Sequence, residues 1–235
     1  LHHIGLASSA TLYRKLPYDT ATAFAPVGLV TDIPMTIVAK SDFPASSIGE
    51  LLDYIRAHKD QVVFAHAGVG SVSHLCGMLL MQALETKMTS VGYKGSGPAM
   101  TDLLGGQVDM TCDQTTNTMG HIRSGKIKAY AVTTPQRLAA LPELPTLDEA
   151  GLEGFEVTAW HGLYAPSGTP QEVVDKLVAA LQTALNDPKV VERFADLGTV
   201  PVSQQQATPA ALGHHLEAEI AKWRPVIADA GEYAE

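Results

Sequence analysis

The chain has 235 residues, 46% of them hydrophobic and 17% charged, and this composition indicates a well-packed globular protein. Its formal net charge of -9 argues against nucleic acid as the main partner, because phosphate binding requires a basic surface. No run in it approaches the roughly 20 apolar residues that a membrane-spanning helix needs.

The start of the chain is predicted to form a short strand over residues 1–6 and a helix over residues 11–16. It has no initiating Met and no signal peptide, and we therefore expect that a preceding segment is missing. Two separate β-type runs are expected at Val27 to Val30 and at Met35 to Ala39, because Thr31-Asp32-Ile33-Pro34 lies between them.

From residue 47 to residue 133, predicted helices and strands alternate. Ser47 and Glu50 have the spacing of a capping box and indicate the start of a helix. Strands are expected at 61–66, 89–93, 108–112 and 128–133, with helices between them. This alternation is typical of a parallel or mixed sheet with helices on both faces. Thr208-Pro209 opens the last predicted helix.

Polar segments follow three of these strands, at residues 67–74, 94–99 and 113–118. Ligands of such sheets bind beyond the carboxyl ends of the strands, and we expect the three segments to converge there. The turn at residues 94–98 opens a predicted helix, and its backbone N–H groups and the helix dipole favour an anion. It lacks the spacing of a nucleotide-binding P-loop.

Several side chains in these segments are candidate ligand contacts. Ser71, Ser73 and His74 could donate to an anion, although His74 could equally be a packed capping residue. Asp113 and Gln114 could bind the polar end of a ligand, and Asp113 suits an ammonium or hydroxyl group; the alternative for Asp113 is a helix cap.

An enzyme is not expected. A Ser–His–Asp set can be assembled from Ser71 or Ser73 with His74 and Asp113, but the GxSxG nucleophile motif is absent. A serine-dependent hydrolase therefore remains only an alternative.

No metal or cofactor is expected either, because the sequence has no HExxH motif and no CxxC pair. Structural or solvated roles are expected for His161, His214 and His215.

The two cysteines, Cys76 and Cys112, lie in apolar surroundings. We expect two buried free thiols rather than a disulfide, because unpaired cysteines are among the most buried residues. On that reading, cysteine usage does not indicate a compartment.

Several longer motifs resemble those of one family. They are the segments LYRKLPYD (12–19), FAPV (24–27), AGVGSVSHL (67–75), YKGSGPA (93–99), DLLGGQVD (102–109), PTLDEAG (145–151) and GLYAP (162–166). The chain from about Leu12 to the last helix resembles the periplasmic solute-binding receptors of tripartite tricarboxylate transporters, also called Bug proteins.

The resemblance implies an α/β, two-lobed fold of the type II periplasmic-binding-protein class (a Venus flytrap), with the first lobe incomplete at the N-terminus. The expected lobes are residues 1–33 with 159–235, and residues 34–158. It also implies that two strand–helix loops grip a ligand carboxylate, and the second of these matches residues 94–99, which makes Gly95, Ser96, Gly97 and Ala99 expected contacts. The first would lie in the missing segment.

The function implied is that of a periplasmic receptor. It would bind a small carboxylate (a di- or tricarboxylate, an amino acid or an aromatic acid) between the lobes and deliver it to a membrane permease. A monomer without a cofactor is expected. The second alternative function is a ligand-sensing partner of a two-component kinase.

Overall fold

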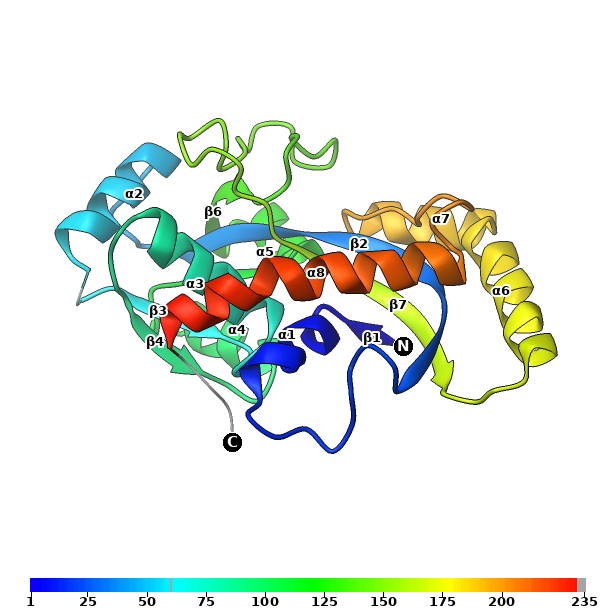
Figure 1. The fold of residues 1–235 in the computed structure, drawn as a ribbon. Coiled ribbons are helices and arrows are strands. Elements are labelled where there is room, and N and C mark those ends of the chain that lie inside the picture. The colour runs from blue at the N-terminus through cyan, green and yellow to red at the C-terminus, as the bar shows by residue number, and fades with distance from the viewer. Residues whose placement is uncertain (60, 232–235) are drawn as a thin grey trace. The chain divides into compact units, whose positions relative to one another are not determined.

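The computed structural model describes residues 1–59 and 61–231. The chain divides into two compact units, of which unit 1 comprises Leu1–Ile33 and Ala159–Glu235 and unit 2 comprises Pro34–Thr158. The chain passes between the units twice, once within β2 and once at the start of β7. Figure 1 labels the helices and strands of both units.

The strands of the described residues are β1 (His2–His3), β2 (Phe24–Lys40), β3 (Val63–His66), β4 (Thr89–Gly92), β5 (Met110–Gln114), β6 (Ile127–Val132) and β7 (Thr158–Pro166). The helices are α1 (Gly5–Leu12), α2 (Ile48–Ala57), α3 (Val72–Ala83), α4 (Ser96–Leu104), α5 (Thr115–Arg123), α6 (Gln171–Leu185), α7 (Pro188–Asp196) and α8 (Pro209–Ala230). Over the described ranges, no helix is long and apolar enough to cross a membrane.

Unit 2 is built on a mixed sheet. The second half of β2 pairs antiparallel with β5 on one side and with β6 on the other. The strand β3 lies between β4 and β5 and is parallel to both. Because β3, β4 and β5 run in the same direction, their carboxyl ends reach the same edge of the sheet. The loops that follow these three strands therefore begin at that edge.

One hydrophobic cluster of unit 2 forms where α4 packs on this sheet. Buried residues of β2, β3 and α4 meet in one cluster, which contains Val38, Ala65, Ala99, Met100, Leu103, Val108 and Ile127. The predicted capping box is present at α2, where the Ser47 side chain accepts from the Glu50 N–H and the Glu50 carboxylate accepts from the Ser46 N–H. Burial of Leu51, Leu52 and Ile55 then fixes which face of α2 turns inward.

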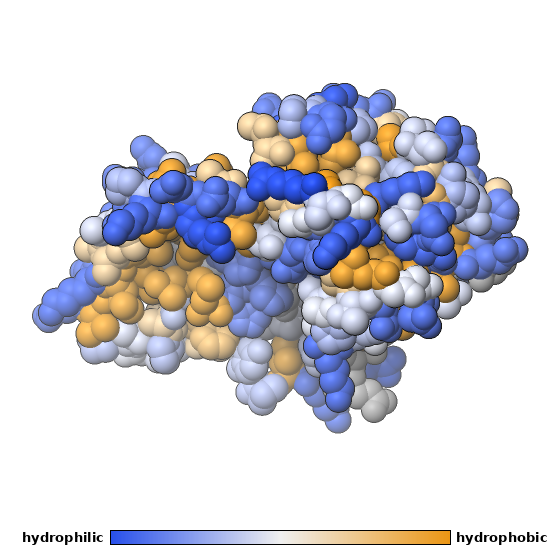
Figure 2. Space-filling model, turned by 180° about the vertical axis from the view of Figure 1, so that it is seen from behind, coloured by the Kyte–Doolittle hydropathy of each residue, from blue (hydrophilic) through white to orange (hydrophobic). Residues whose placement is uncertain are grey.

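Unit 1 combines three strands with helices from the beginning and the end of the chain. The strand order is β1–β7–β2, and α1 packs against α8 (Figure 1). A second cluster holds α6 against β2 and β7 through Val27, Ala165, Leu181, Leu185 and Ala207. Hydrophobic residues also gather on the surface at the end of unit 1 that carries α6 and α7 (Figure 2), where Val173, Leu177 and Val191 are exposed.

The prediction for the first sixteen residues is wrong. The strand is limited to His2–His3, and a helix, α1, already begins at Gly5 and ends at Leu12. Ser8 and Ser9 lie between the two predicted elements, but both are buried in this helix, and their hydroxyl groups donate to the carbonyls of Gly5 and Leu6. Such back-bonding lets a serine lie inside a helix, and packing against α8 stabilises the segment further.

The two β-type runs expected on either side of residues 31–34 form one continuous strand, β2. Thr31 keeps the intervening segment extended, because its hydroxyl group contacts Thr199 Oγ1 at 2.9 Å and donates to the carbonyl of Val200 at 2.8 Å. A contact so distant in sequence is invisible to local patterns, which explains the difference.

Candidate functional site

The three polar segments that follow β3, β4 and β5 lie at one edge of the sheet of unit 2. The register pairs His66 with Gly92 at the ends of β3 and β4. Just beyond, the Gly95 N–H donates to the carbonyl of Ala67 at 3.2 Å. The Ser96 hydroxyl group donates to Asp113 Oδ1 at 3.2 Å and connects the second segment to the third. The structure therefore brings the three segments together.

The N-terminus of α4 supplies the donors of this edge. Gly95 is the N-cap, and its φ of 106° is one that residues with a side chain rarely adopt. Helix geometry leaves the N–H groups of Ser96 and Gly97 without an intrahelical acceptor, and Pro98 has no N–H. Ala99 differs from its neighbours, because its side chain is buried in the core cluster of unit 2. The N–H groups of this turn that lack an intrahelical acceptor are therefore those of Ser96 and Gly97.

Asp113 is a buried carboxylate at the end of β5, with 4% of its surface exposed. Its Oδ1 accepts from the Gln114 N–H at 2.8 Å, from Asn117 Nδ2 at 3.2 Å and from the Ser96 hydroxyl group. Burial raises the pKa of Asp113, and the three hydrogen bonds oppose that shift. All three use Oδ1, and Oδ2 is the oxygen that they do not use.

The helix-cap alternative for Asp113 does not describe this arrangement. The N-cap of α5 is Gln114, and no side chain caps the helix there. Gln114 is half-buried and contributes its backbone N–H to Asp113. Sequence analysis did not single out Asn117, which lies in the first turn of α5 directly after the strand that carries Asp113.

The serines of the loop between β3 and α3 are bonded within that loop. The Ser71 hydroxyl group donates to the carbonyl of Gly68 at 2.6 Å and accepts from the His74 N–H at 3.3 Å. The Ser73 oxygen accepts from the Ala67 N–H at 2.8 Å and lies 3.0 Å from Ser71 Oγ. Both hydroxyl groups therefore have acceptors in the loop itself, and either would have to leave one in order to donate to a ligand.

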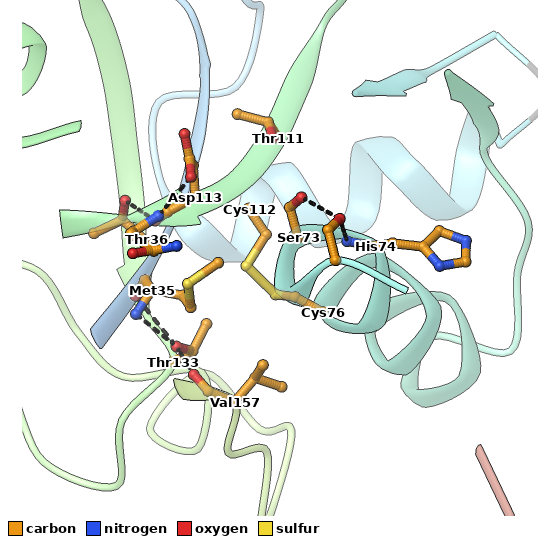
Figure 3. Close-up of a disulfide and its surroundings, with 12 residues drawn as sticks. Met35, Thr36, Ser73, His74, Cys76, Thr111, Cys112, Asp113, Thr133 and Val157 are labelled. Atoms are coloured by element: carbon orange, nitrogen blue, oxygen red, sulfur yellow. Dashed lines mark hydrogen bonds between the residues drawn. A yellow bond between two sulfur atoms is a disulfide. The ribbon is translucent and has the colours of Figure 1, made fainter. Parts of the chain in front are cut away.

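His74 is packed rather than presented to solvent. Only 2% of its surface is exposed, and its Nδ1 accepts from the Gly70 N–H at 3.3 Å. Figure 3 shows its ring pointing away from Ser73. These positions correspond to the packed alternative. They also give no Ser–His–Asp chain, because the acceptors of the serine hydroxyl groups lie within the loop and Asp113 Oδ1 is bonded to other groups.

The prediction of two free thiols is wrong, because Cys76 and Cys112 form a disulfide (Figure 3). The bond joins α3 to β5, two elements that pack against each other. Their Cα atoms lie 6.3 Å apart, within the usual range for a disulfide. Both residues are fully buried, as expected, but the packing of α3 on β5 turns their sulfur atoms toward each other. Cys112 immediately precedes Asp113 and so fixes the candidate site to α3.

Solved structures of similar fold place the chain in a known class. One is that of the periplasmic binding protein BugD, which is 48% identical with a TM-score of 0.93, over 99% of this chain and 78% of that one. A second is MatC from Rhodopseudomonas palustris with bound malate, 40% identical with a TM-score of 0.90, over 96% of this chain and 77% of that one. A third, from R. palustris with adipate, is 32% identical with a TM-score of 0.91, over 98% of this chain and 76% of that one. The fold is therefore that of a two-lobed periplasmic binding protein.

Sequence comparison gives the family within this class. The model of the tripartite tricarboxylate transporter family receptor matches residues 4–231. A protein of Agrobacterium vitis, the UPF0065 protein of the TAR-I ttuE-ttuC' intergenic region, is 51% identical over 99% of this chain and 67% of its own length. Protein BugT of Bordetella pertussis is 32% identical over 96% of this chain and 68% of its own length. The chain belongs to the tripartite tricarboxylate transporter receptor family, and it spans about two thirds of the length of these relatives.

Proposed function

We propose that this protein is an extracytoplasmic receptor that binds a small carboxylate and delivers it to the permease of a tripartite tricarboxylate transporter. The observation that carries the proposal is the edge of unit 2 where the N–H groups of Ser96 and Gly97 lie beside the buried carboxylate of Asp113. Two members of the same fold, at 40% and 32% identity, have malate and adipate bound, which supports a carboxylate as the ligand class.

The proposed roles follow from the charges at this edge. The N–H groups at the start of α4, with the positive end of the helix dipole, take a ligand carboxylate. The oxygen of Asp113 that the three hydrogen bonds do not use takes a hydroxyl or ammonium group at the other end of the ligand. A hydroxy- or amino-substituted acid satisfies both requirements.

Units 1 and 2 are proposed to be the two lobes, with the ligand held between them. In such receptors the lobes close by hinge motion, without any bond made or broken. The hinge residues would be those where the chain passes from one unit to the other, at Ile33–Pro34 and Thr158–Ala159.

Location in the periplasm is part of the same proposal. Structural relatives are periplasmic binding proteins, and the disulfide between Cys76 and Cys112 is of the kind that persists in an oxidising compartment. A monomer is proposed for the receptor.

The test is calorimetry of the protein with malate, succinate, adipate, aspartate and citrate. Binding of at least one of them with a defined stoichiometry is expected, with hydroxy- or amino-substituted acids preferred. The proposal fails if none of these acids binds to protein that is folded and has Ser96 and Gly97 intact. Cross-linking to the permease in membranes, with and without the bound acid, then tests delivery.

A further inference from the structure

Two histidines lie against each other beside the candidate site. His66 is the last residue of β3 and His74 lies in the first turn of α3, so the loop of residues 67–71 connects them. Their ring centroids are 4.4 Å apart with an angle of 41° between the planes. Both are buried, with 4% and 2% of their surfaces exposed. The sequence indicated no role for His66, and for His74 it left open a donor to the ligand or a packed capping residue.

Each ring accepts a hydrogen bond from a glycine of the loop between them. The Gly68 N–H donates to His66 Nδ1 at 3.2 Å, and the Gly70 N–H donates to His74 Nδ1 at 3.3 Å. A ring nitrogen that accepts carries no proton, so in this geometry Nδ1 is the unprotonated nitrogen of each ring. Gly68 and Gly70 have φ angles of 116° and 76°, and the histidines thus hold a backbone that only glycine adopts easily.

Hydrogen bonds within the loop occupy most of its backbone N–H groups. The N–H of Ala67 donates to Ser73 Oγ and that of Ser71 to the carbonyl of Gly68. These two bonds and the two to the histidines use four of the five N–H groups of residues 67–71. The fifth N–H group is that of Val69, a residue that is 52% exposed. The loop is joined to the N-terminus of α4 by the bond from Gly95 to Ala67. Its backbone is therefore fixed next to the donors Ser96 and Gly97.

We propose that His66 and His74 are positioning residues that hold the loop between β3 and α3 in its ligand-binding conformation, and that acid releases both the loop and the ligand. The ligand part of this proposal rests on the proposed function. Protonation of either ring at Nδ1 would set two donors against each other at a glycine N–H. Protonation of both would place two positive charges side by side in a buried site.

The surrounding elements carry few other titratable groups. The elements that pack most extensively against β3 and α3 are β4, β5 and α4. Their titratable side chains are Asp113 on β5 and Asp102 on α4, with Tyr93 and Lys94 directly after β4. Tyr93 donates to Asp102 at 2.7 Å, and Asp113 is hydrogen-bonded to Ser96. His66 and His74 are therefore the two imidazole groups on these described elements.

The test compares variants that keep or remove the acceptor. In His66→Asn/His74→Asn, each amide oxygen can accept from the loop glycine, and this acceptor does not titrate. In His66→Leu/His74→Leu the acceptors are lost. His214→Asn, which changes an exposed histidine of unit 1, is the matched control. Malate is the probe ligand, and single variants at His74 serve if a double variant does not fold.

The expected result has two parts. For malate, the affinity of the unaltered protein and of His214→Asn falls by about tenfold more between pH 7.5 and pH 5.5 than that of the double Asn variant. The double Leu variant binds weakly at both values. Without ligand, the amide NMR signals of Gly68 and Gly70 shift with pH in the unaltered protein and stay constant in the double Asn variant.

Other outcomes separate the two proposals. Equal pH profiles in the unaltered protein and the double Asn variant, or full affinity in the double Leu variant, overturn the positioning role. If malate binds to no variant, the NMR arm decides: signals of Gly68 and Gly70 that do not respond to pH or to the loss of the acceptors overturn the inference. Responsive signals without binding of any acid contradict the proposed function instead.

Discussion

Cys112 is joined to Cys76 by a disulfide at the position directly before Asp113, so that a covalent bond fixes α3 to the strand that carries the buried carboxylate (Figure 3). The two cysteines are 36 residues apart in sequence. In the chain-entropy model, a closed loop of this size lowers the entropy of the unfolded chain and stabilises the folded one. The bond thus stabilises the fold and fixes one wall of the candidate site.

Removal of this disulfide is expected to lower the free energy of unfolding by about 4 kcal/mol. Urea denaturation of the Cys76→Ser/Cys112→Ser variant measures the loss. The chain has only these two cysteines, so treatment of the unaltered protein with a reductant changes the same bond and provides the control. An unfolding midpoint that stays the same after complete reduction would contradict the prediction.

Gly97→Ala is expected to weaken ligand binding without weakening the fold. A Cβ at Gly97 meets no atom within 4 Å, so the added methyl group occupies the space above the start of α4. It displaces the carboxylate that the N–H groups would hold, and affinity is expected to fall about tenfold or more. Calorimetry with a bound acid measures this change.

Gly49→Ala is the matched control for that variant. Gly49 is the second residue of α2 as Gly97 is of α4, and a Cβ there also meets no atom within 4 Å. Each change is expected to stabilise its helix by about 0.5–1 kcal/mol. A loss of affinity in both variants, or in neither, would show that the start of α4 does not bind the ligand.

Local signals in the sequence predicted many of the elements. The spacing of Ser47 and Glu50 identified the start of α2, and Thr208 accepts from the Ala211 N–H at the start of α8. The alternation of strands and helices was enough to place three polar segments after neighbouring strands, because parallel strands end at the same edge. These predictions depend only on residues close together in the chain.

The parts that sequence analysis missed depend on contacts between distant residues. Whether Cys76 and Cys112 are bonded is decided by the packing of α3 on β5, and Ser8 and Ser9 are tolerated in α1 because α8 covers that helix. In the site, a serine looks like a donor until its acceptor is known, as the bond from Ser71 to the carbonyl of Gly68 shows. Sequence gives the residue types of a site, whereas folding decides which of their atoms remain available.

Glu219→Ala is expected to destabilise unit 1. One carboxylate oxygen of Glu219 accepts from the indole N–H groups of both Trp160 and Trp223, each at 3.0 Å. Both indoles are 1% exposed, so the loss of their acceptor leaves two buried donors unpaired. The expected loss is about 2–4 kcal/mol, and Glu219→Gln, which keeps an acceptor oxygen, should lose less.

Trp160 and Trp223 are the only tryptophans of the chain, so its tryptophan fluorescence emission reports directly on them. A shift of the emission to longer wavelength is expected in Glu219→Ala, together with a lower unfolding midpoint. Glu217→Ala changes an exposed residue of the same helix and should behave like the unaltered protein. Equal stability of the two variants would mean that water or another group replaces the lost acceptor.

Asp113→Asn is expected to stabilise the protein near neutral pH and to weaken ligand binding. Burial raises the pKa of Asp113 above its ordinary value of 3.8, so the folded chain binds this proton more readily than the unfolded chain does. Above the raised pKa the ionised carboxylate therefore costs stability, and the cost disappears as the pH falls through the folded pKa. An Asn oxygen can still accept from Ser96 but lacks the charge that favours an ammonium or hydroxyl group, and affinity for such a ligand should fall by about 10- to 100-fold.

Urea denaturation of the unaltered protein and of Asp113→Asn, from neutral to acidic pH, tests the sign of this effect on stability. The stability advantage of Asp113→Asn should be present at neutral pH and shrink as the pH is lowered, whereas the exposed Asp196→Asn should show no such trend. A carboxylate that opposes folding points to a role other than stability, and ligand binding supplies one. If Asp113→Asn is less stable at neutral pH and still binds its acid fully, Asp113 is a structural residue and the ligand's polar group is bound elsewhere.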